Sequence, residues 1–273
     1  MNNNIHDPFF EANKDGWNKR TAVHIASSFY DNQTFKAGKN SLNKPELEEL
    51  GSVEGKSLLH LQCHFGQDTL SWARLGAKVT GIDLSDLAIA EAKKLSAEIN
   101  TPATFVCSNV YDLVGHPEMP EAGSYDVVFT SYGTIGWLPD LDKWAAVISH
   151  FLKPGGIFYI IDFHPVLWMM DDDLSTIKYP YHNFGVIAET NTGTYTDRDA
   201  AIEYKEYSWN HSISEILNAL IDAGLEVQRF NEFSYSPYNC FNNVVQGADG
   251  MWRVKGMEDM IPMMYSVKAG KVE

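Results

Sequence analysis

Cysteine and positive charge are both scarce in this sequence. Cys63, Cys107 and Cys240 are far apart and form no CxxC pair, which argues against a disulfide framework and against a zinc knuckle. The 21 Lys and Arg residues are outnumbered by 36 Asp and Glu residues, so the formal net charge is -15. Because such a charge repels phosphate backbones, we expect no nucleic-acid partner.

Long apolar runs are also missing. No stretch approaches the roughly 18 apolar residues that a membrane-spanning helix needs. The first residues, MNNNIHDPFFEANKDGW, are polar and acidic, whereas a secretory signal would be basic and then apolar. We therefore expect a cytoplasmic protein with no membrane partner. With 273 residues, 44% of them hydrophobic, the chain can bury a core, and its length favours one elaborated domain.

Short apolar runs alternate with longer amphipathic runs from Gly55 onward. This alternation is typical of a parallel sheet covered by helices on both faces. The expected strands are Ser57 to Leu61, Ala77 to Asp83, Ala103 to Cys107, Tyr125 to Thr130, Ile157 to Phe163, Leu225 to Phe233 and Met263 to Lys268. The helices expected before the fifth strand are Asp68 to Leu75, Asp86 to Ile99 with Ser85 as N-cap, and Leu141 to Leu152.

The pattern changes between His164 and His211. Residues 185–196 and 201–209 alternate like antiparallel strands, which indicates a β-rich insertion after the fifth strand. The core pattern resumes where Ser212 and Glu215 form a capping box. We expect four parts: an N-terminal cap (1–50), a cofactor-binding α/β core (51–163), a substrate-side insertion (164–211) and a return to the core sheet (212–273).

Polar residues follow the ends of successive strands, where ligands bind in an open parallel sheet. The loop after the first strand holds a single glycine, Gly66, and a dinucleotide fingerprint would need three. Asp83 ends the second strand, where its carboxylate can accept both hydroxyl hydrogens of a ribose. Asn109 follows the third strand and can bond a base edge, and residues 130–133 follow the fourth. Each residue alone also fits a turn or an N-cap, but together they favour an adenosine site.

Four segments of this sequence resemble the class I S-adenosylmethionine-dependent methyltransferases. They are LLHLQCHFGQDTLSWARLGAKVTGIDLS, SNVYDL, YDVVFTSYGTIGWLPDL and LKPGGIFYIIDFHP. The resemblance is close from about Leu42 to His164 and holds in outline from Ser212 to Lys271. It implies a Rossmann-like α/β fold, with a seven-stranded sheet in the order 3-2-1-4-5-7-6 whose seventh strand is antiparallel.

The resemblance also implies a binding residue for each part of S-adenosylmethionine. The backbone of Gln62, Cys63, His64 and Gly66 would contact the methionine half, Asp83 the ribose, Leu84 the adenine face, and Asn109 and Val110 the adenine edge. The sequence departs from the family at three positions, since an acid is usual at the position of His60 and glycines are usual at those of Gln62 and His64.

Further candidates lie on the acceptor side and in the cap. His164 follows the fifth strand, where its imidazole could remove a proton from the acceptor or serve only a structural role. Tyr132 is a second catalytic candidate, and Trp137 would help to shape the same pocket. Ser131, which follows the fourth strand, is expected to bind the cofactor as part of the floor of its pocket.

The region from Asp7 to Asn40 is rich in aromatic residues, which core packing or a lid over the site could explain. We expect it to be a mobile cap that orders over the cofactor. Within it, Arg20 could pair with the cofactor's carboxylate, and Tyr30 could close over it.

No metal site is expected. His60 and His64 have no third ligand at a useful spacing, and Asp171 to Asp173 fit a solvated turn.

These features lead to the hypothesis of methyl transfer from S-adenosylmethionine to an unidentified small molecule. Two alternatives remain open at this point. One is a cofactor-binding protein without transferase activity, and the other is a nicotinamide-dependent dehydrogenase, which would require the missing three-glycine turn. The sequence leaves the oligomeric state undefined.

Overall fold

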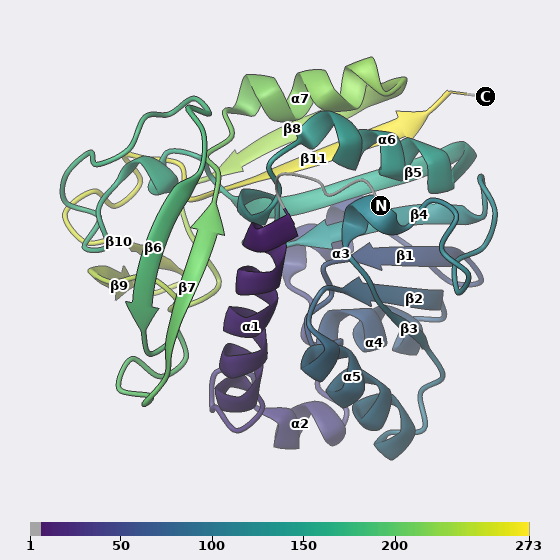
Figure 1. The fold of residues 1–273 in the computed structure, drawn as a ribbon, viewed down its shortest axis with the longest axis horizontal. Coiled ribbons are helices and arrows are strands. Elements are labelled where there is room, and N and C mark those ends of the chain that lie inside the picture. The colour runs from purple at the N-terminus through teal and green to yellow at the C-terminus, as the bar shows by residue number, and fades with distance from the viewer. Residues whose placement is uncertain (1–6, 273) are drawn as a thin grey trace.

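The core of the protein is one seven-stranded sheet. The computed structural model describes residues 7–272, so residues 1–6 of the expected cap and Glu273 lie outside it. The strand order is β3-β2-β1-β4-β5-β11-β8 (Figure 1). Strand β11 is antiparallel to both of its neighbours, and the pairings from β3 to β5 are parallel. The predicted order and the antiparallel last strand are confirmed.

The sheet strands follow the sequence pattern closely. They are β1 (Ser57–Leu61), β2 (Lys78–Asp83), β3 (Thr104–Cys107), β4 (Tyr125–Ser131), β5 (Leu152–Phe163), β8 (Leu225–Phe233) and β11 (Met264–Lys271). Strand β5 begins before the predicted Ile157, because Leu152 already pairs with Tyr125 and the register shifts before the pairing of Val127 with Ile157. The Pro-Gly-Gly segment at 154–156 is therefore an irregularity within the strand.

Helices cover both faces of this sheet. They are α3 (Lys44–Leu50), α4 (Gln67–Arg74), α5 (Asp86–Glu98), α6 (Leu141–Phe151) and α7 (Ile213–Asp222), with the 3-10 turns η1 (Val110–Asp112), η2 (Ile135–Trp137) and η3 (Leu167–Met169). Ser85 caps α5 by accepting the Ala88 N–H, and Ser212 caps α7 by accepting the Glu215 N–H. Both N-caps were predicted.

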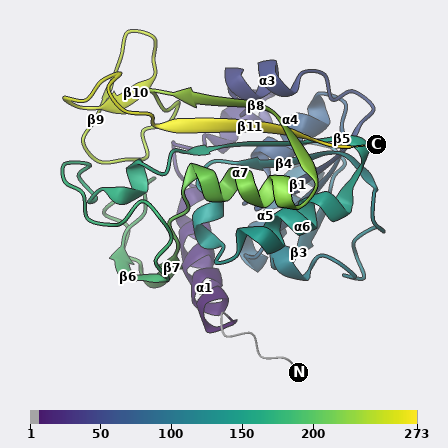
Figure 2. The ribbon, with the colours of Figure 1, turned by 90° about the horizontal axis from the view of Figure 1, so that it is seen from above.

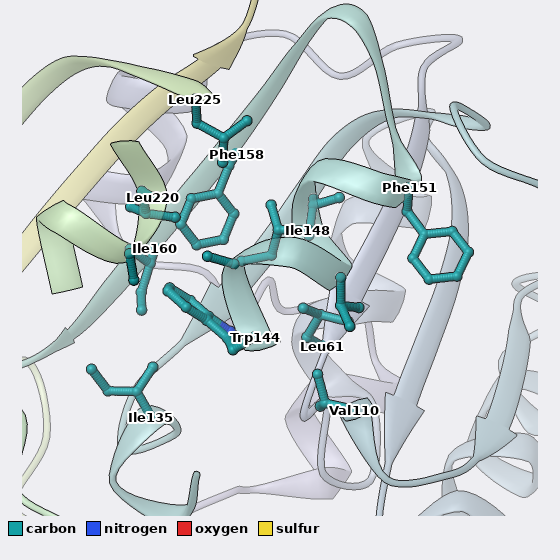
Figure 3. Close-up of a cluster of buried hydrophobic side chains, with 14 of the residues drawn as sticks. Leu61, Val110, Ile135, Trp144, Ile148, Phe151, Phe158, Ile160, Leu220 and Leu225 are labelled. Atoms are coloured by element: carbon teal, nitrogen blue, oxygen red, sulfur yellow. The ribbon is translucent and has the colours of Figure 1, made fainter. Parts of the chain in front are cut away.

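Alternate residues of each strand pack against opposite helix layers. Leu59 and Leu61 belong to the cluster under α6 and α7, whereas Leu58 belongs to the cluster under α3 and α4. Figure 2 shows α3 on one side of the sheet and α6 and α7 on the other. In the first cluster the Trp144 ring meets Phe158 edge-on at 5.3 Å (Figure 3). Burial on both faces fixes the register of the central strands, because a one-residue slip would exchange the two sets.

The segment after β5 forms the predicted antiparallel hairpin. Its strands are β6 (Ile187–Thr192) and β7 (Glu203–Ser208). Two further strands, β9 (Val244–Gln246) and β10 (Trp252–Val254), form a second hairpin between β8 and β11. The second hairpin was not predicted, because each of its strands has only three residues and shows no usable alternation.

The N-terminal segment folds as helix α1 (Asp7–His24) and the short helix α2 (Asn32–Lys36). Figure 1 shows α1 between the β6–β7 hairpin and the sheet core. The Asn13 side-chain amide donates to the Tyr207 carbonyl and accepts the Tyr207 N–H, both at 2.8 Å. On the other side, Asn18 accepts the Ser85 hydroxyl at 2.6 Å. Helix α1 therefore joins the insertion to the start of α5. None of the helices within residues 7–272 is both long and apolar enough to cross a membrane.

Candidate functional site

A cavity of about 1090 Å³ lies at the carboxyl ends of β1, β2, β4 and β5. Its wall combines the strand-end loops with α1, the β6–β7 hairpin and the segment after β8. The structure brings together every cofactor residue expected from the sequence, since Arg20, Tyr30, Gln62, Cys63, His64, Gly66, Asp83, Leu84, Asn109, Val110 and Ser131 all line the cavity.

The loop after β1 keeps a glycine-like backbone even where glycines are absent. Gln62 and His64 have positive φ angles of 57° and 50°, and Gly66 has a φ of 84°. A side chain in this left-handed region costs about 1 kcal/mol. Gln62 and His64, which replace the usual glycines, therefore leave the loop in the conformation that glycine would favour. They also add two polar side chains to the cavity.

Asp83 holds this loop in place. Its Oδ2 accepts the His64 N–H at 2.8 Å, and its Oδ1 accepts the Ser85 N–H at 2.9 Å. Burial raises the pKa of Asp83 to about 6, although the backbone hydrogen bonds act in the opposite direction. Each carboxylate oxygen has a further lone pair, so Asp83 can still accept hydrogens from a ribose diol at neutral pH.

Leu84, Asn109 and Val110 form the neighbouring part of the cavity wall. The Asn109 carboxamide oxygen accepts the Tyr111 N–H at 3.1 Å and thereby caps η1. This N-cap role is one of the ordinary interpretations of a strand-end amide. The oxygen keeps a second lone pair and the amide keeps its N–H₂ group, so a base edge could still be bonded here.

Several buried side-chain polar atoms of the described residues have no hydrogen-bond partner, and three of them belong to residues of the cavity wall. These three are Arg20 Nε, Gln62 Oε1 and His64 Nδ1. Gln62 is held from its other end, because Nε2 donates to the Thr134 carbonyl at 2.8 Å. An unpaired buried polar atom costs about 1 to 3 kcal/mol, so these atoms indicate a polar ligand. The donor Nε and the acceptor Oε1 match the carboxylate and ammonium of an amino acid.

Arg20 is fixed by its surroundings rather than free to move. Its guanidinium forms an ion pair with Glu206 of β7 and stacks on the rings of Trp17, Trp137 and Tyr204, with centroids 4.8, 5.2 and 4.2 Å away. Its side chain is 8% exposed. The pair with Glu206 leaves Nε available, so the predicted bond to a carboxylate remains open.

His24 connects three parts of the cavity wall. Its Nδ1 lies 2.9 Å from His64 Nε2, and its Nε2 lies 2.6 Å from the Thr194 hydroxyl of the insertion. Burial lowers the pKa of His24 to about 2 and that of His64 to about 3, so both rings are neutral at pH 7. Nearby, the Tyr30 and Tyr195 hydroxyls are 2.5 Å apart. Hydrogen bonds at His24 thus connect the cap, the loop after β1 and the insertion.

The loop after β4 is organised by a buried carboxylate on β5. Asp162 is 1% exposed and accepts the N–H groups of Gly133, Thr134 and Phe163. Tyr132, at the start of this loop, lines the cavity with a positive φ of 49°. Its hydroxyl donates to the Glu46 carboxylate, 3.0 Å from Oε2. Trp137 lines the cavity as well, as predicted.

His164 lies elsewhere than the sequence suggested. It is 3% exposed and is absent from the cavity wall, and its Nε2 lies 2.9 Å from Glu232 Oε1. The backbone explains this position, because the His164 N–H donates to the Met263 carbonyl beside β11 and its Nδ1 accepts the Val166 N–H. The expectation that the ring faces the acceptor pocket is corrected, since the ring lies against Glu232.

Sequence reasoning missed several residues around the cavity. Asn43 and Tyr238 line it, and Glu46 lies directly behind Tyr132. Asn43 and Glu46, with Pro45 between them, carry the signal of a helix start, and Glu46 Oε1 does accept the Asn43 N–H. That signal could have predicted α3. The helix-start signal does not indicate that the Glu46 carboxylate is buried or that it faces Tyr132.

Part of the chain is similar to methyltransferases. The model of a methyltransferase domain family matches residues 59–158. A methyltransferase of Synechocystis sp. is 35% identical over 135 residues, which cover 48% of this chain and 59% of the relative. A ubiquinone biosynthesis O-methyltransferase of Chromobacterium violaceum is 34% identical over 117 residues, covering 43% and 48%. The chain thus spans about half the length of these curated relatives.

The fold has a close match among solved structures. An S-adenosylmethionine-dependent methyltransferase from Mesorhizobium loti superposes with a TM-score of 0.56 at 19% identity, covering 86% of this chain and 100% of that one. At this identity the match concerns the fold alone.

Replacing Gly66 with alanine should destabilise the protein by about 2 to 4 kcal/mol. An added Cβ would lie 2.8 Å from the Phe105 ring, in a left-handed conformation that alanine disfavours. Gly115 is a matched control, because it also has a positive φ but has open space around its Cβ position. Gly115→Ala should cost about 1 kcal/mol. Urea unfolding measures both, and equal losses would show that the close contact with Phe105 does not matter.

Proposed function

We propose that the chain is a class I S-adenosylmethionine-dependent methyltransferase, which transfers a methyl group from S-adenosylmethionine to a small-molecule acceptor. The fold and the match of a methyltransferase domain model over residues 59–158 support this proposal. One observation carries this proposal. The strand-end cavity combines Asp83 with buried, unpaired polar atoms on Arg20 and Gln62.

Each of these residues suits one part of the cofactor. The Asp83 carboxylate would accept the ribose hydroxyls, as the sequence suggested. Gln62 Oε1 would accept from the ammonium group, and Arg20 Nε would donate to the carboxylate. Leu84, Asn109 and Val110 would surround the adenine. When bound, the sulfonium supplies an electrophilic methyl group, so the chain has to orient the acceptor, exclude water and remove a proton where needed.

The cavity is also suited to a compact acceptor. It is roofed by α1 and by the β6–β7 hairpin, and aromatic rings such as Trp168 and Phe241 line the part formed by the insertion and the segment after β8. The net charge of -15 opposes a nucleic-acid substrate. A location in the cytoplasm stays a prediction from the sequence.

Labelled methyl transfer tests this function directly. The protein is incubated with methyl-labelled S-adenosylmethionine and a deproteinised cell extract, and label is measured in the small-molecule fraction. We expect label to appear there in proportion to enzyme. Cofactor binding without any transfer would instead favour a binding protein that lacks transferase activity.

Asp83→Ala should weaken cofactor binding by on the order of 2 to 4 kcal/mol, because it removes charged hydrogen bonds and leaves two ribose hydroxyls unpaired. Calorimetry with S-adenosylhomocysteine measures this loss. Asp86→Ala is the control, since Asp86 begins α5 three residues later but contacts Asn18 and Lys14 outside the cavity wall. Unchanged affinity in Asp83→Ala would reject the ribose assignment.

The cap should respond to the cofactor. Backbone amides from Asp7 to Asn40 should exchange hydrogen more slowly when S-adenosylhomocysteine is bound, because a ligand beside Arg20 and Tyr30 would hold this segment over the cavity. Helix α7 packs on the distant sheet face and should exchange at the same rate in both states. Equal exchange of the cap with and without ligand would show that it is not a lid.

A further inference from the structure

We propose that the acceptor's proton leaves through Tyr132 to Glu46, so that this pair of residues provides the base for methyl transfer to a hydroxyl-bearing acceptor. This inference rests on the proposed function. Tyr132 would touch the acceptor, and Glu46 would act only through Tyr132.

The hydrogen bonds around Tyr132 determine to which group its hydroxyl donates and from which group it accepts. The hydroxyl lies 3.1 and 3.0 Å from the two Glu46 oxygens and donates its proton to them. Asn43 Nδ2 donates to the same hydroxyl oxygen at 3.1 Å. One lone pair of the oxygen is left for a proton that arrives from the cavity. Tyr132 is thus arranged to receive a proton on one side and to release one on the other.

Glu46 is a carboxylate without an ordinary counterion. It is 0% exposed, and no Lys, Arg or His of the described residues forms an ion pair with it. The titratable groups that face it are the acid Asp68 and the tyrosines Tyr132, Tyr159, Tyr235 and Tyr238. Burial raises the pKa of Glu46 to about 7 and Asp68 adds to the rise, whereas hydrogen bonds from Asn43 and Tyr132 oppose it. Glu46 can therefore take up and release a proton near neutral pH.

Helix capping alone does not account for this arrangement. Glu46 Oε1 accepts the Asn43 N–H at 2.8 Å at the start of α3. A glutamine could accept the same bond without the cost of a buried charge. What a glutamine could not do is gain a proton. Complete burial and the two contacts to Tyr132 thus favour a role in proton transfer.

The surroundings of Tyr132 define the acceptor's chemistry. The Tyr132 ring lies 6.0 Å from that of Phe163, which meets the Phe241 ring at 4.8 Å, and Trp168 lies beside both. Phe163, Trp168 and Phe241 line the cavity. On the other side, the Tyr238 hydroxyl accepts from Asn43 Nδ2 at 2.8 Å and can donate its own proton. An apolar or aromatic body that carries a hydroxyl group fits this combination.

The proposed step is balanced. As the acceptor oxygen forms its bond to the methyl carbon, the carbon–sulfur electron pair stays on sulfur. The acceptor's O–H proton passes to the Tyr132 oxygen, and the proton of Tyr132 passes to Glu46. One positive charge on sulfur and one negative charge on Glu46 are both removed, so the buried site gains no net charge. Glu46 then returns its proton to solvent between turnovers.

The experiment compares Glu46→Gln with wild type and with Glu49→Gln. Glu49 lies on the same helix but bonds Asn231 and Ser266 and does not line the cavity, which makes it a matched control. For each protein, labelled methyl transfer into the deproteinised extract is measured across pH, and S-adenosylhomocysteine affinity is measured by calorimetry.

In wild type the transfer rate should rise with pH through about 7, because Glu46 accepts a proton only when it is deprotonated. Glu46→Gln should lower the rate about 10²- to 10⁴-fold and abolish this rise. Its affinity for S-adenosylhomocysteine should stay within about twofold of wild type, since Glu46 lies outside the cavity wall. Glu49→Gln should match wild type in rate and in pH profile.

Tyr132→Phe provides a second, independent variant if Glu46→Gln folds poorly. It removes the hydroxyl and keeps the ring, so it should lose rate and pH dependence to a similar extent. Combining both changes should add little to either one, because the two residues act as a unit. Normal transfer with the normal pH rise in either single variant would overturn the inference. Wild type that binds S-adenosylhomocysteine but transfers no label would overturn the proposed function itself.

Discussion

The hydrogen bond from the His64 N–H to the Asp83 carboxylate is the contact on which the site depends. Parallel pairing of β1 and β2 places Asp83 beside the loop after β1, and the bond holds that loop with two side-chain-bearing residues in left-handed conformations. From this loop, Gln62 reaches the loop after β4, and His64 reaches His24 of the cap. One backbone contact therefore sets the positions of groups from four different parts of the chain.

The cavity wall has a floor and a roof that come from different parts of the chain. Its floor consists of strand ends whose side chains are buried on both faces of the sheet, and Asp162 ties the loop after β4 to this floor. Its roof consists of α1 and a hairpin that pair with each other through Asn13 and Arg20. The buried Glu46 and the half-buried Tyr132 meet where α3 contacts the loop after β4, beside the floor.

Much of the fold could be predicted from the sequence, because strands and helix starts leave local patterns of apolar and capping residues. Apolar runs placed the seven strands of the sheet, and Ser85 and Ser212 marked helix starts that the structure confirms. The residues expected at the cofactor side do line one cavity, because a parallel sheet brings consecutive strand ends to one edge. His164 shows the limit of this reasoning. Strand-end position put it at the correct edge, but contacts with Glu232 and with the backbone near β11 turned its ring away from the cavity.

The sequence pattern did not identify residues whose partners come from distant parts of the chain. Glu46 appears as a helix-start residue until the fold brings Tyr132 against it, and His24 appears as one aromatic residue among many until the insertion supplies Thr194. Their environment is created by segments that are distant in the chain. Only the assembled structure shows which polar groups are buried together.

The contact of Asn13 with Tyr207 also covers the outer edge of strand β7. Strand β7 pairs with β6 on one side, and on its other side the Asn13 carboxamide bonds the backbone of Tyr207 as a neighbouring peptide group would. An uncovered strand edge is a template for pairing with another chain. Helix α1 thus shields the hairpin against strand addition by a second copy. A chain shortened by this helix would face intermolecular β-pairing and aggregation as a cost separate from any loss at the cavity.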